Sequence, residues 1–230
     1  VEGKKLHTGQ THYLAGQPEV TLEAQDELAG TETTFVSIDG AAYQAYEGPI
    51  VLEAETQTQI KFYSVDHVGN AETPQELVLH TDMQPPQSSI TIEGRHNDNV
   101  LPASSALHIQ ASDSLSGLDH IYYSLNGGAV SVYNNKLKAS DLEEGKHSIT
   151  YYAKDKAGNQ SETKIMHFAV DKTPPRLAQD IIGDQYYARG QAFSSGRSRV
   201  RIVAADNRAG VEAIYYRRNK GKSQKNTKPF

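Results

Sequence analysis

Five aspartates at the ends of predicted strands are the residues of this chain best suited to bind a metal ion. Asp113 and Asp155 each begin a short loop, and Asp82 lies in a linker that should meet the same pole of the fold. Carboxylate, backbone and Asn oxygens are the hard ligands that calcium prefers. Asp171 and Asp206 form the equivalent set further along the chain. Calcium is therefore the one cofactor that the sequence suggests.

The same aspartates have a structural interpretation that needs no metal. An Asp at the start of a turn accepts hydrogen bonds from backbone N–H groups one or two residues on, and a following Gly takes the left-handed conformation. The runs 113–117 and 155–159 both fit this pattern. Turn capping is the interpretation that the sequence favours, and calcium is the alternative.

Four aromatic residues form a second candidate binding surface. Tyr122 and Tyr152 alternate with apolar residues in their strands, which predicts that they stand side by side on the outer face of a sheet. Phe35 and Tyr63 are their counterparts earlier in the chain. Exposed aromatics can stack on sugar rings or contact a partner protein. Cross-strand aromatic pairs also stabilise sheets by roughly 0.2–1 kcal/mol, which is the simpler explanation.

Signatures of catalysis are missing from the sequence. No nucleophile motif is present, and none of the nine His residues occurs in a His-x-His or His-Glu-x-x-His arrangement. The residues that recur along the chain are turn formers and linkers, without an additional acid and base. We therefore predict that the protein is not an enzyme.

Composition excludes several other classes of protein. The 230 residues include no Cys, so neither disulfides nor Cys-ligated metals are available. A net charge of −5 argues against nucleic-acid binding. No stretch approaches the roughly 18 apolar residues of a membrane-spanning helix, so we expect no membrane insertion. Because the chain starts at Val1, without an initiator Met or a signal peptide, we expect a mature or excised piece of a longer protein.

Three sequence markers recur at nearly constant spacing. An Asp-x-x-x-Gly frame occurs at 26–30, 113–117 and 206–210. Two other runs recur once each after 89 residues: DHVGN at 66–70 as DKAGN at 155–159, and DMQPP at 82–86 as DKTPP at 171–175. Such self-similarity indicates tandem domains.

The Pro-Pro steps are natural domain boundaries because proline pairs favour extended, stiff connections. We therefore predict three repeats, at 1–84, 85–173 and 174–230. The third is incomplete, because aligning 214–216 with 121–123 leaves the chain ending before the counterparts of the last two strands of the second repeat. It is either cut by a boundary within a longer protein or completed by a strand from a partner.

Within a repeat the hydrophobic period is two, as in β-strands. Asn126-Gly127 between extended runs predicts a tight hairpin, and Asp39-Gly40 is its equivalent in the first repeat. No amphipathic helix is predicted. Seven strands are expected in the second repeat, near 89–94, 105–112, 119–125, 129–133, 136–140, 146–154 and 162–170. Seven short strands in fewer than 90 residues indicate an all-β sandwich of the immunoglobulin or fibronectin type III kind.

The motifs at 121–128, 144–159 and 170–175 resemble the bacterial Ig-like repeats of secreted and surface proteins, especially the type named after a leptospiral outer-membrane surface protein. The resemblance covers the second repeat fully, the first well and the third only to its middle. The first repeat departs from the pattern at Thr31–Thr34, where an apolar strand start is expected. Such repeats serve as stalks, adhesion modules and accessory domains of exported enzymes, so the resemblance implies an extracellular, cell-surface or periplasmic location.

These observations predict a non-catalytic segment of an exported bacterial protein that acts as a surface spacer, adhesion or protein-interaction module. One alternative is a carbohydrate-contacting accessory module of a secreted enzyme. Another is an assembly subunit whose third sandwich is completed by a partner strand. The expected partners are a protein or a glycan at a surface, together with adjacent domains of the same chain. The run 217–228 carries six basic residues and no acidic one, which fits either a contact arm for an anionic partner or a solvated hairpin.

Overall fold

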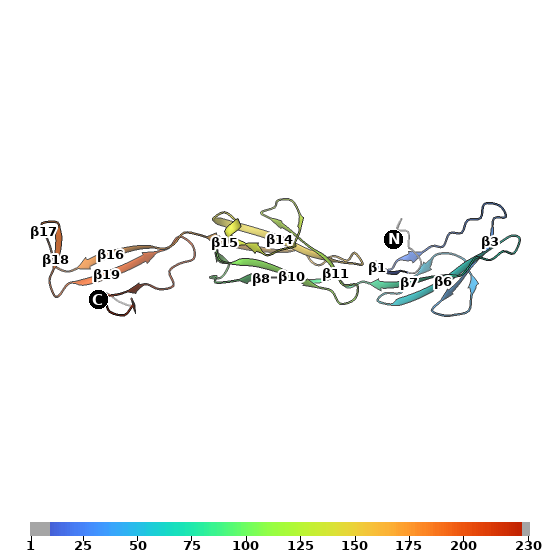
Figure 1. The fold of residues 1–230 in the computed structure, drawn as a ribbon, viewed down its shortest axis with the longest axis horizontal. Coiled ribbons are helices and arrows are strands. Elements are labelled where there is room, and N and C mark those ends of the chain that lie inside the picture. The colour runs from blue at the N-terminus through green and yellow to red at the C-terminus, as the bar shows by residue number, and fades with distance from the viewer. Residues whose placement is uncertain (1–9, 227–230) are drawn as a thin grey trace. The chain divides into compact units, whose positions relative to one another are not determined.

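The computed structural model describes residues 10–226, whose regular elements are β-strands apart from one short 3-10 helix (Figure 1). Two compact units are distinguished. Unit 1 comprises 1–91, 109–135 and 149–166, and unit 2 comprises 92–108, 136–148 and 167–230. Because the predicted second repeat contributes residues to both units, the three repeat boundaries remain a prediction. Within the described part of the chain, no helix has the length and apolar character needed to cross a membrane.

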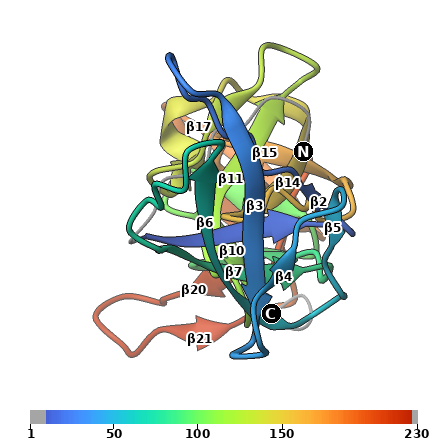
Figure 2. The same cartoon turned by 90° about the vertical axis from the view of Figure 1, so that its right-hand side faces the viewer.

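Seven strands belong to the predicted first repeat: β1 (Thr11–Ala15), β2 (Glu19–Val20), β3 (Thr31–Ile38), β4 (Gln44–Ala45), β5 (Ile50–Val51), β6 (Gln57–Asp66) and β7 (Gln75–Asp82). They form a five-stranded sheet of order β1-β7-β6-β3-β4 and a small sheet of β2 and β5. Strands β3, β6 and β7 lie side by side and antiparallel (Figure 2). Edge strand β1 is the exception, because it pairs with β7 in parallel.

The two sheets of this repeat enclose a common core. Ile60 on β6 and Leu79 on β7 face Val20 and Leu52, which lie on β2 and directly after β5. All four side chains are buried. Alternate residues of each strand point to opposite faces, so the period-two pattern places one apolar set between the sheets. The result is a β-sandwich, as the sequence predicts.

Eight strands and one short 3-10 helix belong to the predicted second repeat: β8 (Gln87–Glu93), β9 (Val100–Pro102), β10 (Ala106–Ser112), β11 (Leu118–Leu125), β12 (Ser131–Val132), β13 (Leu137–Lys138), η1 (Ala139–Asp141), β14 (Gly145–Asp155) and β15 (Lys164–Asp171). The sheet orders are β13-β10-β8 and β12-β11-β14-β15-β9. All seven predicted runs correspond to observed strands. The prediction missed β9, which has only three residues and pairs in parallel with β15.

The predicted third repeat contains β16 (Arg176–Ile182), β17 (Gln185–Ala188), β18 (Gln191–Ser194), β19 (Arg199–Ala205), β20 (Tyr215–Tyr216) and β21 (Gln224–Lys225). These strands form three antiparallel pairs, of which β16 with β19 is the longest (Figure 1). Val200 and Ile202 are half-buried on β19, whereas their counterparts Leu107 and Ile109 on β10 are fully buried. The strand pairing of this repeat is therefore formed without a closed core among residues 172–226.

Truncating a core residue tests the sandwich. Ile60 is completely buried between the sheets of the first repeat. Ile60→Ala should therefore lower the free energy of unfolding by roughly 2–5 kcal/mol, because it removes apolar contacts and leaves a cavity. Chemical denaturation followed by circular dichroism measures this loss. The control Val51→Ala, at a mostly exposed position on β5, should change stability by less than about 0.5 kcal/mol. Equal effects of the two substitutions would contradict the described core.

Candidate metal centre

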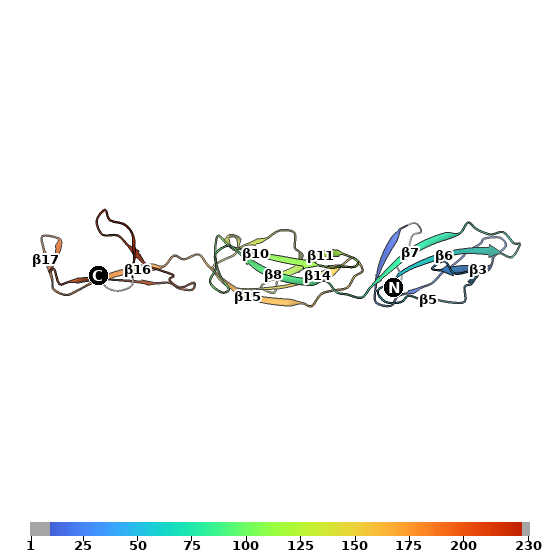
Figure 3. The same ribbon diagram turned by 90° about the horizontal axis from the view of Figure 1, so that it is seen from below.

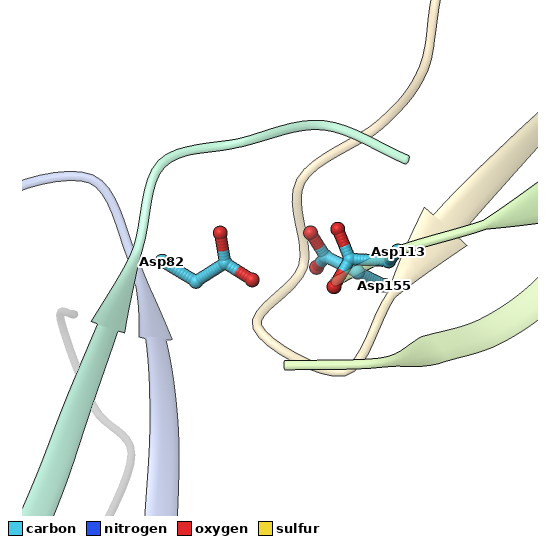
Figure 4. A group of neighbouring side chains, drawn as sticks. All are labelled: Asp82, Asp113 and Asp155. Atoms are coloured by element: carbon cyan, nitrogen blue, oxygen red, sulfur yellow. The ribbon is translucent and has the colours of Figure 1, made fainter. Parts of the chain in front are cut away.

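Three of the five predicted aspartates come together in unit 1 (Figure 4). Asp82 is the last residue of β7, Asp113 follows β10 directly, and Asp155 is the last residue of β14. One carboxylate oxygen from each lies within 4.8 Å of the others. Asp82 is 0% exposed, Asp155 is 2% exposed and Asp113 is half-buried. The ends of β7, β10 and β14 thus place three carboxylates in one small region. Figure 3 shows β7 and β14 from another side.

The loops that begin with Asp113 and Asp155 contain the hydrogen bonds of capped turns. Asp113 Oδ1 accepts the Gly117 N–H at 2.8 Å, and Asp155 Oδ1 accepts the Asn159 N–H at 2.8 Å. Gly117 has a φ of +80°, a left-handed conformation in which a residue with a side chain would be strained. These bonds account for the Asp-to-Gly spacing of the repeated motif without a ligand.

Asp82 connects the end of β7 to both loops. Its Oδ2 accepts the N–H of Ser116 at 2.9 Å, and its Oδ1 accepts the N–H of Gln84 at 2.9 Å. The side-chain amide of Asn159 donates to the backbone carbonyl of Asp82 at 2.8 Å and to Asp155 Oδ2 at 2.8 Å. The linker strand and the loops are therefore joined by direct hydrogen bonds that include a buried carboxylate.

Charge compensation in this cluster comes from neutral N–H groups rather than from basic side chains. Among residues 10–226, no Lys, Arg or His forms an ion pair with Asp82, Asp113 or Asp155. Burial of ionised carboxylates without a cation is costly. A divalent cation would relieve that cost, and the oxygen donors fit the preference of calcium. Calcium binding therefore remains a prediction, in which Asp82, Asp113 and Asp155 would hold the ion.

Asp171 and Asp206 repeat part of this arrangement in unit 2. Asp171 Oδ2 accepts the N–H of Ala209 at 2.8 Å, and Asp206 Oδ1 accepts the N–H groups of Arg208 and Gly210 at 3.0 and 2.9 Å. The N–H of Arg208 is the main cause that lowers the pKa of Asp206 below its ordinary value of 3.8. The side chains of Asp171 and Asp206 interact with each other, and among the described residues only the Asp82 cluster groups three carboxylates.

The predicted aromatic residues lie in cross-strand pairs. Phe35 on β3 faces Tyr63 on β6 with ring centroids 5.2 Å apart, and Tyr122 on β11 faces Tyr152 on β14 at 5.1 Å. Both pairs are stacked. Lys154 Nζ lies 5.9 Å from the centre of the Tyr122 ring. Because each ring already covers its partner, these contacts supply the sheet-stabilising role, and binding of a glycan or protein by this surface remains a prediction.

Sequence reasoning missed three residues that hold the loops together. Asn159 ends a recognised motif, but nothing in the motif indicated that its side chain bonds to Asp82. Ser116 contributes its backbone, which has no signal in sequence. Glu144 accepts hydrogen bonds from the Thr173 hydroxyl and the Asn207 amide in unit 2. The Thr173 hydroxyl is the main cause that lowers the pKa of Glu144.

A thermal shift measurement tests the calcium prediction. If the three carboxylates hold the ion, calcium at about 100 times its Kd should add roughly 2.7 kcal/mol of stability relative to excess chelator. Asp113→Asn should abolish this response, because the amide keeps the oxygen that caps the turn but loses the charge. The control Asp119→Asn alters an exposed residue of β11 and should retain the response. Identical melting curves of the unaltered chain in calcium and in chelator would contradict the prediction.

The lowered pKa of Asp206 predicts a specific acid response. A carboxyl group whose folded pKa is depressed contributes stability above its unfolded pKa, and this contribution is lost as the pH falls through the folded value. The Arg208 and Gly210 amide NMR signals should therefore titrate with a midpoint below 3.8, the ordinary value for Asp. Asp206→Asn should remove that transition. A midpoint at or above 3.8 would show that these hydrogen bonds do not stabilise the charged form.

Comparison with known proteins identifies no family for the chain. No family model and no curated protein sequence matches it. The fibronectin(III)-like modules of CbhA from Clostridium thermocellum match with 11% identity and a TM-score of 0.41, covering 72% of this chain and 90% of that one. A 1.5-MDa bacterial ice-binding adhesin, described for host cell surface retention, matches with 13% identity and a TM-score of 0.28, covering 67% and 58%. Because both TM-scores are below 0.5, the sandwich fold rests on the strand pairing and core of this chain itself.

Proposed function

We propose that this chain is a non-catalytic segment of Ig-like repeats from an exported bacterial protein, acting as a spacer and adhesion module. The observation that carries the proposal is a hydrogen bond between a carboxylate at the end of one predicted repeat and a backbone N–H in the next. It occurs twice, from Ser116 to Asp82 and from Ala209 to Asp171. We call this contact the carboxylate joint.

The two carboxylate joints share the same detailed pattern. In each, one oxygen of the aspartate accepts the N–H two residues further along the linker, at Gln84 in the first and Thr173 in the second. The other oxygen accepts the N–H of the fourth residue in the Asp-x-x-x-Gly loop. Recurrence of one geometry indicates that the joint is a property of the repeat and not of a single linker.

A joint of this kind limits the motion of the linker. Asp82 is completely buried, and hydrogen bonds to ionised groups contribute roughly 1.5–3 kcal/mol each, about twice the value for neutral pairs. Pro86, four residues on, is also buried, and proline restricts its own φ and the preceding residue. Restricted linkers are what a spacer needs, since it must transmit position from one domain to the next.

An enzyme is the less favoured alternative because the grouped polar side chains serve the loops. The aspartates accept backbone hydrogen bonds, and the paired aromatics cover one another. Adhesion to a protein or glycan partner at the cell surface follows from the proposed role of the repeats, as does an extracellular or periplasmic location. An accessory module of a secreted enzyme and an assembly subunit remain the alternatives.

Breaking one carboxylate joint tests the proposal. Asp82→Ala removes both acceptor oxygens, so the Ser116 amide should exchange with solvent at least about tenfold faster, the factor expected for a loss near 1.4 kcal/mol. Nitrogen-15 relaxation should show that residues 31–82 and 113–155 reorient together in the unaltered chain and more independently in the variant.

The matched control is Asp119→Ala, which removes an exposed carboxylate from β11. It should leave the exchange rate of the Ser116 amide and the relaxation of both segments unchanged. If Asp82→Ala also leaves them unchanged while its core strands stay folded, the joint does not couple the repeats and the spacer proposal fails.

A further inference from the structure

Charge is divided very unevenly along this chain. Residues 1–173 contain 11 basic and 24 acidic residues, whereas residues 174–230 contain 12 basic and 4 acidic residues. The modest net charge of −5 therefore conceals an acidic part of −13 and a basic part of +8. A charge separation of this size favours binding of an anionic partner by the basic part, and repels such a partner from the rest.

Five of the twelve basic residues of 174–230 lie on a hairpin whose turn recurs at the corresponding place in each of the three predicted repeats. Asp39, Asn126 and Asn219 occupy the same turn position, with φ angles of 49°, 53° and 51°. In each turn, the N–H two residues later donates to the carbonyl of the residue before that position, at 3.0, 2.9 and 3.0 Å. The third turn lies between β20 and β21. Its fold therefore follows from the same Asn or Asp residue as in the other two.

Only the third turn carries cations. The corresponding segments 37–43 and 124–130 contain no Lys or Arg. The β20–β21 hairpin carries exposed basic side chains at Arg217, Arg218, Lys220, Lys222 and Lys225. Lys228, the last basic residue of the run, lies outside the described residues. Because the same turn forms twice without cations, these side chains are not required for the turn itself.

Four of these cations are available to a ligand. Among residues 10–226, no carboxylate forms an ion pair with Arg217, Lys220, Lys222 or Lys225. By contrast, Arg201 on β19 pairs with Asp180 at 3.1 Å. The hairpin thus presents positive charge that the surrounding described residues do not neutralise.

The predicted third repeat also exposes aromatic rings. Tyr215 on β20 is 65% exposed and lies opposite Lys225 of β21. Tyr186 and Tyr187 on β17 are 70% and 69% exposed, and Arg189 lies at the turn that follows them. Unlike Tyr122 and Tyr152, whose rings are stacked on one another, these rings present most of their surface to solvent. An aromatic face with an adjacent cation suits a sugar ring that bears an acidic group.

We propose that the β20–β21 hairpin is a binding site for an acidic polysaccharide. Arg217, Lys220 and Lys222 would pair with carboxylates of successive uronic acid residues, and Tyr215 would stack on a sugar ring. Duplex nucleic acid fits less well, because its charge density of about one per 1.7 Å would be strongly repelled by the acidic remainder of the chain. This site is independent of the carboxylate joint, so neither proposal depends on the other.

Binding of polygalacturonate to the full chain tests the site. Isothermal titration calorimetry should detect binding at low salt that weakens as sodium chloride is raised, because the ion pairs are exposed and screened. The variant Arg217→Gln, Lys220→Gln and Lys222→Gln should lose at least about tenfold in affinity, since each exposed ion pair contributes modestly. Asn219 and Gly221 are retained, so the turn should still form.

The matched control is Lys138→Gln, Lys146→Gln and Lys156→Gln, which removes three exposed cations from the acidic part. It lowers the net charge by the same amount and should leave the affinity within about twofold. Absence of binding by the unaltered chain, or equal losses in the two variants, would overturn the proposal. Tighter binding of duplex DNA or of phosphatidylserine vesicles than of polygalacturonate would assign the hairpin to a different class of partner and would also overturn it.

Discussion

The rest of this structure depends on the hydrogen bonds that aspartate carboxylates accept from backbone N–H groups. The loops of a sandwich leave backbone donors unpaired where the strands end, and buried donors must find a partner. Asp113 and Asp155 supply that partner within their own loops, and Asp82 supplies it to the loop of the following repeat. The same residue type, aspartate, therefore stabilises both the local turns and the connection between successive repeats.

The carboxylates also explain why a metal site and a turn motif are hard to separate by sequence. Both need Asp at a strand end, followed by a tight loop that contains Gly. A metal site also needs carboxylates from different loops to lie close together. Whether they do so depends on where the strand before the linker ends. Asp82, Asp113 and Asp155 meet in this way, although most of their oxygens already accept hydrogen bonds.

Prediction from sequence succeeded where a periodic pattern or a recurrent motif was present. The alternation in β11 and β14 placed Tyr122 opposite Tyr152, and the repeated turns were located correctly. It failed where the contact depends on the backbone or on a distant residue. The three-residue β9 has no period to detect, and the bond from Asn159 to Asp82 spans 77 residues. The high exposure of Tyr215 could not be predicted from strand alternation either, because the exposure of a side chain depends on which strands lie nearby.

The parallel pairing of β1 with β7 gives the fold a mechanical property. These two strands lie close to opposite ends of the first predicted repeat, and five residue pairs align them. Tension applied to the two ends of that repeat would pull parallel neighbours in opposite directions along their length. The hydrogen bonds between them would then be loaded together in shear instead of opening one at a time, and the rate of forced unfolding would depend on breaking them as a group. The β9–β15 pair is also parallel and lies at the edge of its sheet, with three aligned residue pairs, so part of the resistance to pulling would lie in the edge strands.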